Sequence, residues 1–352
     1  MTPKLSKLYS LFARLTSFTI VVLFVSLQII SCKKKNDNIV QNTDNVYIAG
    51  SSNGPLFWKN DTMYYPLSFI NLFGQTSSIF VNGNDIYVAG WVSTTNATQA
   101  AYWKNGYLKT LDTESQANSI FTSDDTDVYV AGSKFIGDNA TGYWTPWYWK
   151  NGTGVRLPAE LDEAFATSVF INGSDVYVAG YDYSYYRSIA KVWKNGVPLD
   201  LDRNPIFAYA YSMFINGRDV YVAGQYRTTR EGNLIATYWK NSTRIDLTDS
   251  SENASANSIF VKGNDVYVAG YTYKDITNPS AATATCWKNG IPMPLQDATQ
   301  GAQANSVFVK GDNVYVAGNL NASSTSQIPV YWKNGVLVKL NGPGSTTGIF
   351  VK

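Results

Sequence analysis

The sequence predicts an all-β fold that consists of seven copies of one four-stranded unit. Two short motifs lead to this prediction, because each recurs seven times at intervals of 40 to 48 residues and the two strictly alternate. The first motif, VYVAG with minor variation, has its tyrosine at Tyr47, Tyr87, Tyr129, Tyr177, Tyr221, Tyr267 and Tyr315. The second motif, Trp-Lys-Asn, has its tryptophan at Trp58, Trp103, Trp149, Trp193, Trp239, Trp287 and Trp332. A period in the forties indicates sheets stacked around an axis, which is a seven-bladed β-propeller.

Each unit contains two predicted hairpins. The stretch SIFVKGNDVYVAG (258–270) has two β-rich runs joined by a Gly/Asn/Asp turn, and ATYWKNSTRIDL (236–247) has two more. In five copies the second turn is Asn-Gly, which suits a type I′ turn because both residues tolerate positive φ. The exceptions are Asn60-Asp61 and Asn241-Ser242, which are also turn-forming residues.

The second strand of each unit explains why the units must pack on one another. VYVAG is apolar throughout, as expected for a strand covered on both faces. Its tyrosine and valines fill the space between neighbouring sheets, and Ala-Gly allows backbones to approach closely.

The chain ends on TGIFVK (347–352), a shortened copy of the first strand of the unit. The first VYIAG (46–50) has a Trp-Lys-Asn partner but no such strand before it. We therefore expect residues 348–352 to pair beside residues 45–50, so that both ends of the chain complete one blade and close the ring without open sheet edges.

The first 31 residues are predicted to be a signal peptide. A positively charged start precedes the apolar run FTIVVLFVSLQII (18–30), and Ser31-Cys32 closes it. The polar segment 32–43 has too little apolar surface to fold and is predicted to be a flexible tether, which leaves 44–352 for the propeller. An uncleaved N-terminal membrane helix is the alternative for the apolar run.

The stretch IISC (29–32) resembles the lipobox of bacterial lipoproteins. This resemblance implies that Cys32 carries a diacylglyceryl anchor and becomes the first residue of the mature protein. Lys33 follows it, where aspartate would be the family's usual signal for the inner membrane, so the resemblance favours the outer membrane.

The repeated unit resembles the kelch repeat in its order of inner strand, turn, VYVAG and tryptophan-bearing strand, with Ala-Gly where kelch has a glycine pair. It is also similar to the extracellular HAF-type repeats of bacteria, whose units carry a small-residue strand and a later W-x-x-G. The resemblance covers about residues 44 to 352, and the prediction of a propeller does not depend on it.

Composition excludes several kinds of function. After removal of residues 1–31 the chain has 25 Lys+Arg and 26 Asp+Glu, which does not favour a nucleic-acid partner. Cys286 is the only cysteine besides Cys32, so the propeller cannot contain a disulfide. Histidine is absent, which removes the commonest metal ligand and catalytic base. No metal, cofactor or catalytic residue is predicted, and the domain is expected to be monomeric.

Candidate ligand-binding residues lie in the loops between the second and third strands, where the copies differ. Three tryptophans fall outside the repeated motif, all in these loops, and a tyrosine cluster accompanies them: Trp91, Trp144, Trp147, Tyr181, Tyr183, Tyr185 and Tyr186. Flat aromatic rings beside polar groups suit a sugar ligand, because rings stack on the apolar faces of pyranoses. The alternative interpretation is that these aromatic residues fill gaps between blades.

Two sets of repeated polar residues are expected to have structural roles. The seven lysines of Trp-Lys-Asn are predicted to be solvated or locally paired, and each turn carboxylate is predicted to order its own turn; the alternative is a charged ring that docks an anionic partner. The turn carboxylates are Asp44, Asp85, Asp127, Asp175, Asp219, Asp265 and Asp312. The serines of the inner strands are predicted to satisfy backbone groups, or else to bind a small ligand at the channel mouth; they are Ser78, Ser119, Ser168, Ser212, Ser258 and Ser306.

The sequence thus favours a non-enzymatic binding or interaction module, held at a membrane by the lipid on Cys32 and recognising a glycan or a protein. One alternative is an enzyme on polysaccharide, either a hydrolase with two carboxylates or a lyase with Tyr and Lys, because only carboxylate, Lys, Tyr or Ser could catalyse. Another is a structural subunit of an outer-membrane assembly, which predicts a contiguous apolar patch.

Overall fold

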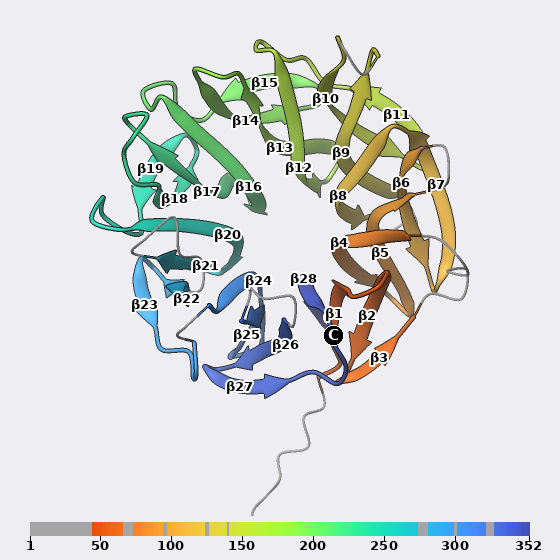
Figure 1. Ribbon diagram of the computed structural model, residues 1–352, viewed down its shortest axis with the longest axis vertical. Coiled ribbons are helices and arrows are strands. Elements are labelled where there is room, and N and C mark those ends of the chain that lie inside the picture. Colours follow the sequence, from red (N-terminus) through yellow and green to blue (C-terminus); the bar gives the residue numbers. More distant parts are fainter. Residues whose placement is uncertain are drawn as a thin grey trace, which may run out of the picture. The chain divides into compact units, whose positions relative to one another are not determined.

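A computed structural model confirms the predicted seven-bladed β-propeller (Figure 1). It describes residues 44–65, 73–93, 97–123, 127–138, 141–273, 281–298, 301–321 and 327–352. These residues form seven antiparallel four-stranded sheets arranged in a ring. Blade 1 contains β1, β2, β3 and β28, and blades 2 to 7 contain β4–β7, β8–β11, β12–β15, β16–β19, β20–β23 and β24–β27.

The strands follow the same order in every blade, from the axis to the rim. The inner strands are β4 (Phe73–Asn82), β8 (Ser115–Thr122), β12 (Glu163–Asn172), β16 (Phe207–Asn216), β20 (Asn253–Lys262), β24 (Gln303–Lys310) and β28 (Ser345–Val351). The second strands are β1 (Val46–Ser51), β5 (Asp85–Ser93), β9 (Val128–Ile136), β13 (Asp175–Tyr183), β17 (Asp219–Arg227), β21 (Asp265–Tyr273) and β25 (Asn313–Leu320).

The third and outer strands form the second hairpin of each unit. The third strands are β2 (Pro55–Lys59), β6 (Thr98–Lys104), β10 (Tyr143–Lys150), β14 (Ser188–Lys194), β18 (Ile235–Lys240), β22 (Thr283–Lys288) and β26 (Ile328–Lys333). The outer strands are β3 (Thr62–Tyr64), β7 (Tyr107–Thr113), β11 (Thr153–Arg156), β15 (Val197–Asp200), β19 (Thr243–Asp246), β23 (Ile291–Met293) and β27 (Val336–Lys339).

The predicted closure of the ring is confirmed. β28 pairs antiparallel with β1, with Val351 opposite Val46 and Ile349 opposite Ile48. Figure 1 shows the C-terminal strand beside β1 on the inner side of the blade. The first and last described strands of the chain therefore share one sheet, which leaves no inner sheet edge open at this blade.

The repeated motifs account for the packing of the blades. All seven motif tryptophans are at most 1% exposed, so each is part of the core between blades. The glycine of VYVAG lies opposite a β-bulge of the inner strand, and a Cβ at Gly90 would come within 1.9 Å of the Gln75 carbonyl oxygen. The predicted close approach at Ala-Gly is therefore confirmed, because the backbone leaves no room for a side chain there.

The turn of the second hairpin is type I′ in all seven blades, with positive φ at both central residues. Its asparagine also ties the two motifs together. In blade 2, Asn105 Oδ1 accepts a hydrogen bond from the Ile86 backbone N–H, and Asn105 Nδ2 donates to Asp85. The same pair of contacts recurs in blades 3 to 6, which explains why Trp-Lys-Asn and VYVAG occur together.

The predicted local pairing of lysines and turn carboxylates is confirmed in five blades. Their Nζ–Oδ2 distances are 2.7 to 3.0 Å, in the pairs Lys104–Asp85, Lys150–Asp127, Lys194–Asp175, Lys240–Asp219 and Lys288–Asp265. Each lysine also lies over the motif tyrosine of its blade, as Lys104 does over Tyr87 at 5.3 Å from the ring centroid.

The prediction was wrong for Asp44 and Asp312, which lie one residue before the paired position. That position holds Asn45 and Asn313, which accept the hydrogen bond of the turn asparagine in place of a carboxylate. Asp44 instead pairs with two lysines of blade 7, Lys310 at 3.0 Å and the motif residue Lys333 at 3.9 Å. Asp312 is fully exposed and lies 3.5 Å from Lys262 of blade 6. An offset of one residue moves a strand side chain to the other face of the sheet.

The predictions for the signal peptide, the tether and Cys32 concern residues 1–43, which lie outside the described residues. Within the part that is described, no helix has the length and apolar character that would let it cross a membrane.

Candidate functional site

The centre of the propeller is lined at one level by a ring of seven phenylalanines, one from each inner strand. Adjacent ring centroids are 4.7 to 5.3 Å apart around the full circle of Phe80, Phe121, Phe170, Phe214, Phe260, Phe308 and Phe350. Such pairs each contribute about 0.5–1.5 kcal/mol beyond burial. A cavity of about 230 Å³ adjoins this ring along the axis.

The inner-strand serines also line this central cavity, but their hydroxyls are engaged. Each accepts a hydrogen bond of 3.1 to 3.4 Å from a backbone N–H of the next blade; the serines are Ser78, Ser119, Ser168, Ser212, Ser258 and Ser306. The expectation that they satisfy backbone groups is confirmed. The seventh position, in β28, is Gly348. These serines therefore connect the blades to one another.

Aromatic side chains form a continuous cluster near the mouth of the central cavity, across blades 3, 4 and 5. We define the aromatic cluster as Phe135, Trp144, Phe165, Tyr181, Tyr209 and Tyr211. Successive ring centroids along it are 5.0 to 6.4 Å apart, and every member is half-buried. Tyr211 lines the central cavity, so the cluster extends from the rim of the channel outward to blade 3.

A stacked pair from blade 6, Tyr271 and Tyr273, lies close to the same cluster. Its ring centroids are 5.6 Å apart. Burial raises the pKa of Tyr211 well above its usual value, and the nearby hydroxyls of Tyr181, Tyr271, Tyr209 and Tyr273 add to this effect. The pair thus places two tyrosines of blade 6 near Tyr211 of the cluster.

The tyrosines of this site are poor bases. Burial raises the pKa of Tyr181 to about 12, and burial also raises the pKa of Tyr209, Tyr271 and Tyr273. At neutral pH their hydroxyls are therefore protonated and can donate or accept hydrogen bonds. A general base for neutral pH needs a pKa near 7, so the arrangement suits binding better than proton abstraction.

The aromatic residues singled out in the sequence divide into two groups. Trp144 and Tyr181 lie in the aromatic cluster, with Phe165 between them at 6.3 and 5.2 Å. Tyr183 lies near the cluster, as its contribution to the raised pKa of Tyr181 indicates. These three lie on one surface, as a shared binding site requires.

The remaining predicted residues lie elsewhere. Trp147 packs on the motif residue Trp149 at 6.4 Å and donates its indole N–H to Thr145 within the blade. Trp91, in β5, makes no ring contact with the cluster among the described residues. Tyr185 and Tyr186 are 64% and 73% exposed and form a separate pair, with a centroid distance of 4.9 Å.

Sequence reasoning missed most of the cluster because it considered loops rather than strand ends. Phe165, Tyr209 and Tyr211 belong to inner strands, and Tyr271 and Tyr273 belong to a second strand. The signal was present, since Tyr181 and Tyr271 are both the first residue after Ala-Gly, and Tyr183 and Tyr273 the third. Alternate strand residues share a face, so these four side chains point to equivalent sides of blades 4 and 6.

A buried charged group stabilises blade 4. Lys191 and Asp182 are both 0% exposed, and Lys191 Nζ lies 2.7 Å from Asp182 Oδ2 and 2.9 Å from Glu160 Oε1. Asp182 is the only fully buried carboxylate among the described residues, and it is not among those lining the central cavity. Two buried acids from different blades at the channel mouth, the arrangement expected of a glycoside hydrolase, are thus not found in the described part of the chain.

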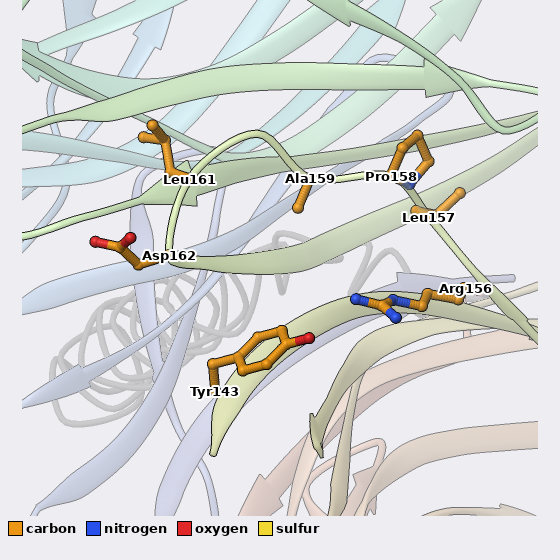
Figure 2. A pocket seen from close by; sticks show the side chains of 7 residues that line it. All are labelled: Tyr143, Arg156, Leu157, Pro158, Ala159, Leu161 and Asp162. Atoms are coloured by element: carbon orange, nitrogen blue, oxygen red, sulfur yellow. The ribbon is translucent and has the colours of Figure 1, made fainter. Parts of the chain in front are cut away.

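A separate open hollow of about 650 Å³ lies between blade 3 and the link to blade 4 (Figure 2). Tyr143 and Arg156 line it from the blade, and the link contributes Leu157, Pro158, Ala159, Leu161 and Asp162. The link is fixed because the Trp193 indole donates to the Pro158 carbonyl oxygen. Among its lining residues only Arg156, Asp162 and Tyr143 have polar side-chain groups. The hollow therefore indicates the chemistry of a ligand less clearly than the aromatic cluster does.

The described residues contain no group of three or more His, Cys, Asp or Glu side chains with the geometry of a metal site. Cys286 is 0% exposed, and burial raises the pKa of its thiol to about 12. A thiolate nucleophile at this position is excluded at neutral pH.

Comparison with known proteins gives the fold but no family. No protein-family model matches the chain, and no curated protein matches its sequence. A puromycin-hydrolyzing peptidase from Mycobacterium tuberculosis superposes with a TM-score of 0.55 at 11% identity, over 85% of this chain and 52% of the peptidase. An acylaminoacyl peptidase from Pyrococcus horikoshii gives 0.49 at 10% identity, over 84% and 50%, and the polysaccharide lyase Uly1 gives 0.46 at 10% identity, over 75% and 80%.

The chain thus spans about half the length of the two peptidases. At 11% identity the likeness to the first peptidase shows the fold alone, and function has to be argued from the side chains. The fold defines this chain as a seven-bladed β-propeller protein with an aromatic surface at its channel mouth.

Proposed function

We propose that this propeller is a non-enzymatic binding module that recognises a glycan through the aromatic cluster. The observation that carries the proposal is the unbroken series of ring contacts from Phe135 to Tyr211, formed by half-buried side chains of three blades. Rings held in place by one another form a rigid surface, which binds a sugar face at a small entropic cost.

The motif residues support this proposal by exclusion. Their tryptophans are buried between blades, and the asparagines and the five paired lysines are engaged in contacts within their own blade. Because these side chains are buried or engaged in the same way in every blade, few of their polar groups are free to bind a ligand. The aromatic cluster belongs to blades 3, 4 and 5 and is not repeated around the ring, which gives this surface the asymmetry that a specific ligand requires.

The tyrosine hydroxyls supply polar partners for the sugar. Since burial raises the pKa of Tyr181 to about 12, its hydroxyl remains a hydrogen-bond donor at any physiological pH. Ring faces and hydroxyls within one surface match the apolar faces and hydroxyl edges of a pyranose.

We also propose that the domain acts at a bacterial outer membrane, anchored by a lipid on Cys32. The lipobox-like stretch IISC and the polar segment after it support this proposal. Metabolic labelling with a clickable palmitate analogue tests it: wild type should be labelled, and labelling of Cys32→Ser would contradict it.

A glycan-binding screen of the protein tests the proposed function. We expect at least one oligosaccharide to bind, and Trp144→Ala to weaken that binding at least tenfold. Tyr107→Ala is the matched control, because Tyr107 is a 69% exposed aromatic residue on the outer strand of blade 2. Release of shortened or unsaturated products during the screen would instead indicate a polysaccharide hydrolase or lyase.

A further inference from the structure

We infer that the glycan recognised by the aromatic cluster is acidic, and that Arg227 binds the carboxylate of a uronic acid residue. This inference rests on the proposed function and adds the class of sugar. Arg227 ends β17, the second strand of blade 5, and lies opposite Phe207 of the inner strand. Its guanidinium stacks on the buried Phe207 ring at 4.5 Å from the centroid.

The strand register places Arg227 among the tyrosines of the site. It is the third residue after Ala-Gly in blade 5, the position that Tyr183 occupies in blade 4 and Tyr273 in blade 6. Burial raises the pKa of Tyr209, and the Ser188 hydroxyl and the Arg227 charge act in the opposite direction. The guanidinium is therefore close enough to the aromatic cluster to act on one of its hydroxyls.

Arg227 has no charged partner among the described residues. Its Nε atom is buried and makes no hydrogen bond there. Two other arginines of the same region are neutralised, since Arg203 pairs with Glu160 and Arg244 pairs with Asp202. Arg230 instead lies over the exposed pair Tyr185 and Tyr186, away from the aromatic cluster. A guanidinium that stacks on a buried ring and lacks a carboxylate is well prepared to receive one from a ligand.

An acidic sugar fits both features of this surface at once. A uronic acid residue has a pyranose face for the tyrosine rings and a planar carboxylate for the arginine fork. The arginines of the fold are also confined to this side of the ring, since all seven lie between Arg156 and Arg244. A neutral sugar would leave the Arg227 charge unpaired, at a cost in affinity.

The test compares short uronate oligosaccharides with their carboxyl-reduced counterparts, using the full-length protein and titration calorimetry. We expect the uronate forms to bind at least tenfold more tightly. Arg227→Gln should weaken binding of the uronate form at least tenfold and that of the reduced form less than twofold, whereas Arg227→Lys should retain part of the preference. Arg218→Gln is the matched control, because Arg218 is exposed at the opposite, turn end of the same hairpin.

The outcomes separate this inference from the proposed function. Equal affinity for the two sugar forms, or an equal loss for both in Arg227→Gln, would overturn the role of Arg227 while leaving glycan binding in place. Failure of every neutral and acidic oligosaccharide to bind would overturn the proposed function and this inference together. A normal melting temperature for Arg227→Gln would show that its effect on binding does not arise from unfolding.

Discussion

The phenyl rings of Phe350 and Phe80 lie 5.1 Å apart, at an angle of 61° between their planes, although the two residues are far apart in the sequence. Phe350 also contacts Phe308 at 4.8 Å, so one side chain of β28 joins blade 7 to blade 2 through blade 1. The ring of phenylalanines is complete only because β28 supplies its seventh member.

Phe350→Ala is expected to destabilise the whole propeller. Removal of a core phenylalanine costs about 3–5 kcal/mol, and Phe350 is half-buried, so we expect the lower part of this range. The free energy of unfolding from urea denaturation measures this. Phe73→Ala, at a residue that is 76% exposed, should have little effect, and equal stability of both variants would contradict a role for ring closure.

Lys191→Met should be strongly destabilising because it leaves Asp182 buried without its counter-charge. Breaking a buried ion pair on one side costs about 3–5 kcal/mol. The double variant Lys191→Met with Asp182→Leu should recover much of this loss, since it removes both charges. Denaturation of the two single variants and the double variant gives the coupling energy. Additive effects would show that the pair does not interact as described.

The Cys286 thiol should not react in the folded protein. It is 0% exposed, and burial raises its pKa to about 12, so almost no thiolate is present at pH 8. In a Cys32→Ser variant, a colorimetric thiol reagent should detect no thiol under native conditions and one after denaturation. Rapid reaction of the native protein would contradict the packing of β22.

The contribution of Asp44 to stability should depend on pH. A hydrogen bond from Tyr315 and another from Lys310 hold the pKa of Asp44 below its usual value. Because the folded pKa is depressed, this stabilisation is present above the unfolded pKa of about 3.9 and is lost as the pH falls through the folded value. The difference in Tm between wild type and Asp44→Asn should therefore be present at pH 7 and shrink below about pH 4. Asp312→Asn, at a fully exposed residue, should show no such difference at pH 7.

The fold could be predicted from the sequence because its information is repeated. Each VYVAG and Trp-Lys-Asn copy specifies the same turn, the same buried tryptophan and the same asparagine contacts, so seven weak local signals agree. Even the closing strand was predictable, since TGIFVK matches the start of a unit.

The site was harder to predict because its contacts cross between blades. Tyr181 contacts Tyr209, which is in the next blade, and the distance between them depends on blade packing rather than on strand pattern. Trp147 shows the converse, since its place in a loop-like segment suggested binding but β10 extends far enough to pack it on Trp149. Nothing in the sequence pattern indicated a binding role for Arg227. Its role follows from the strand register, which places it at the position of Tyr183 and Tyr273 in the adjacent blades.

The central claim is that the aromatic cluster binds a glycan, and the affinity of Tyr181→Ala tests it most directly. Tyr181 contacts Phe165, Tyr209 and Tyr211, so its loss interrupts the aromatic surface at its middle. In calorimetric titrations with the oligosaccharide that binds wild type most tightly, Tyr181→Ala should bind at least tenfold more weakly, a loss of about 1.4 kcal/mol of binding free energy. The control Tyr107→Ala should bind as tightly as wild type. Wild-type affinity in a folded Tyr181→Ala protein would contradict the claim.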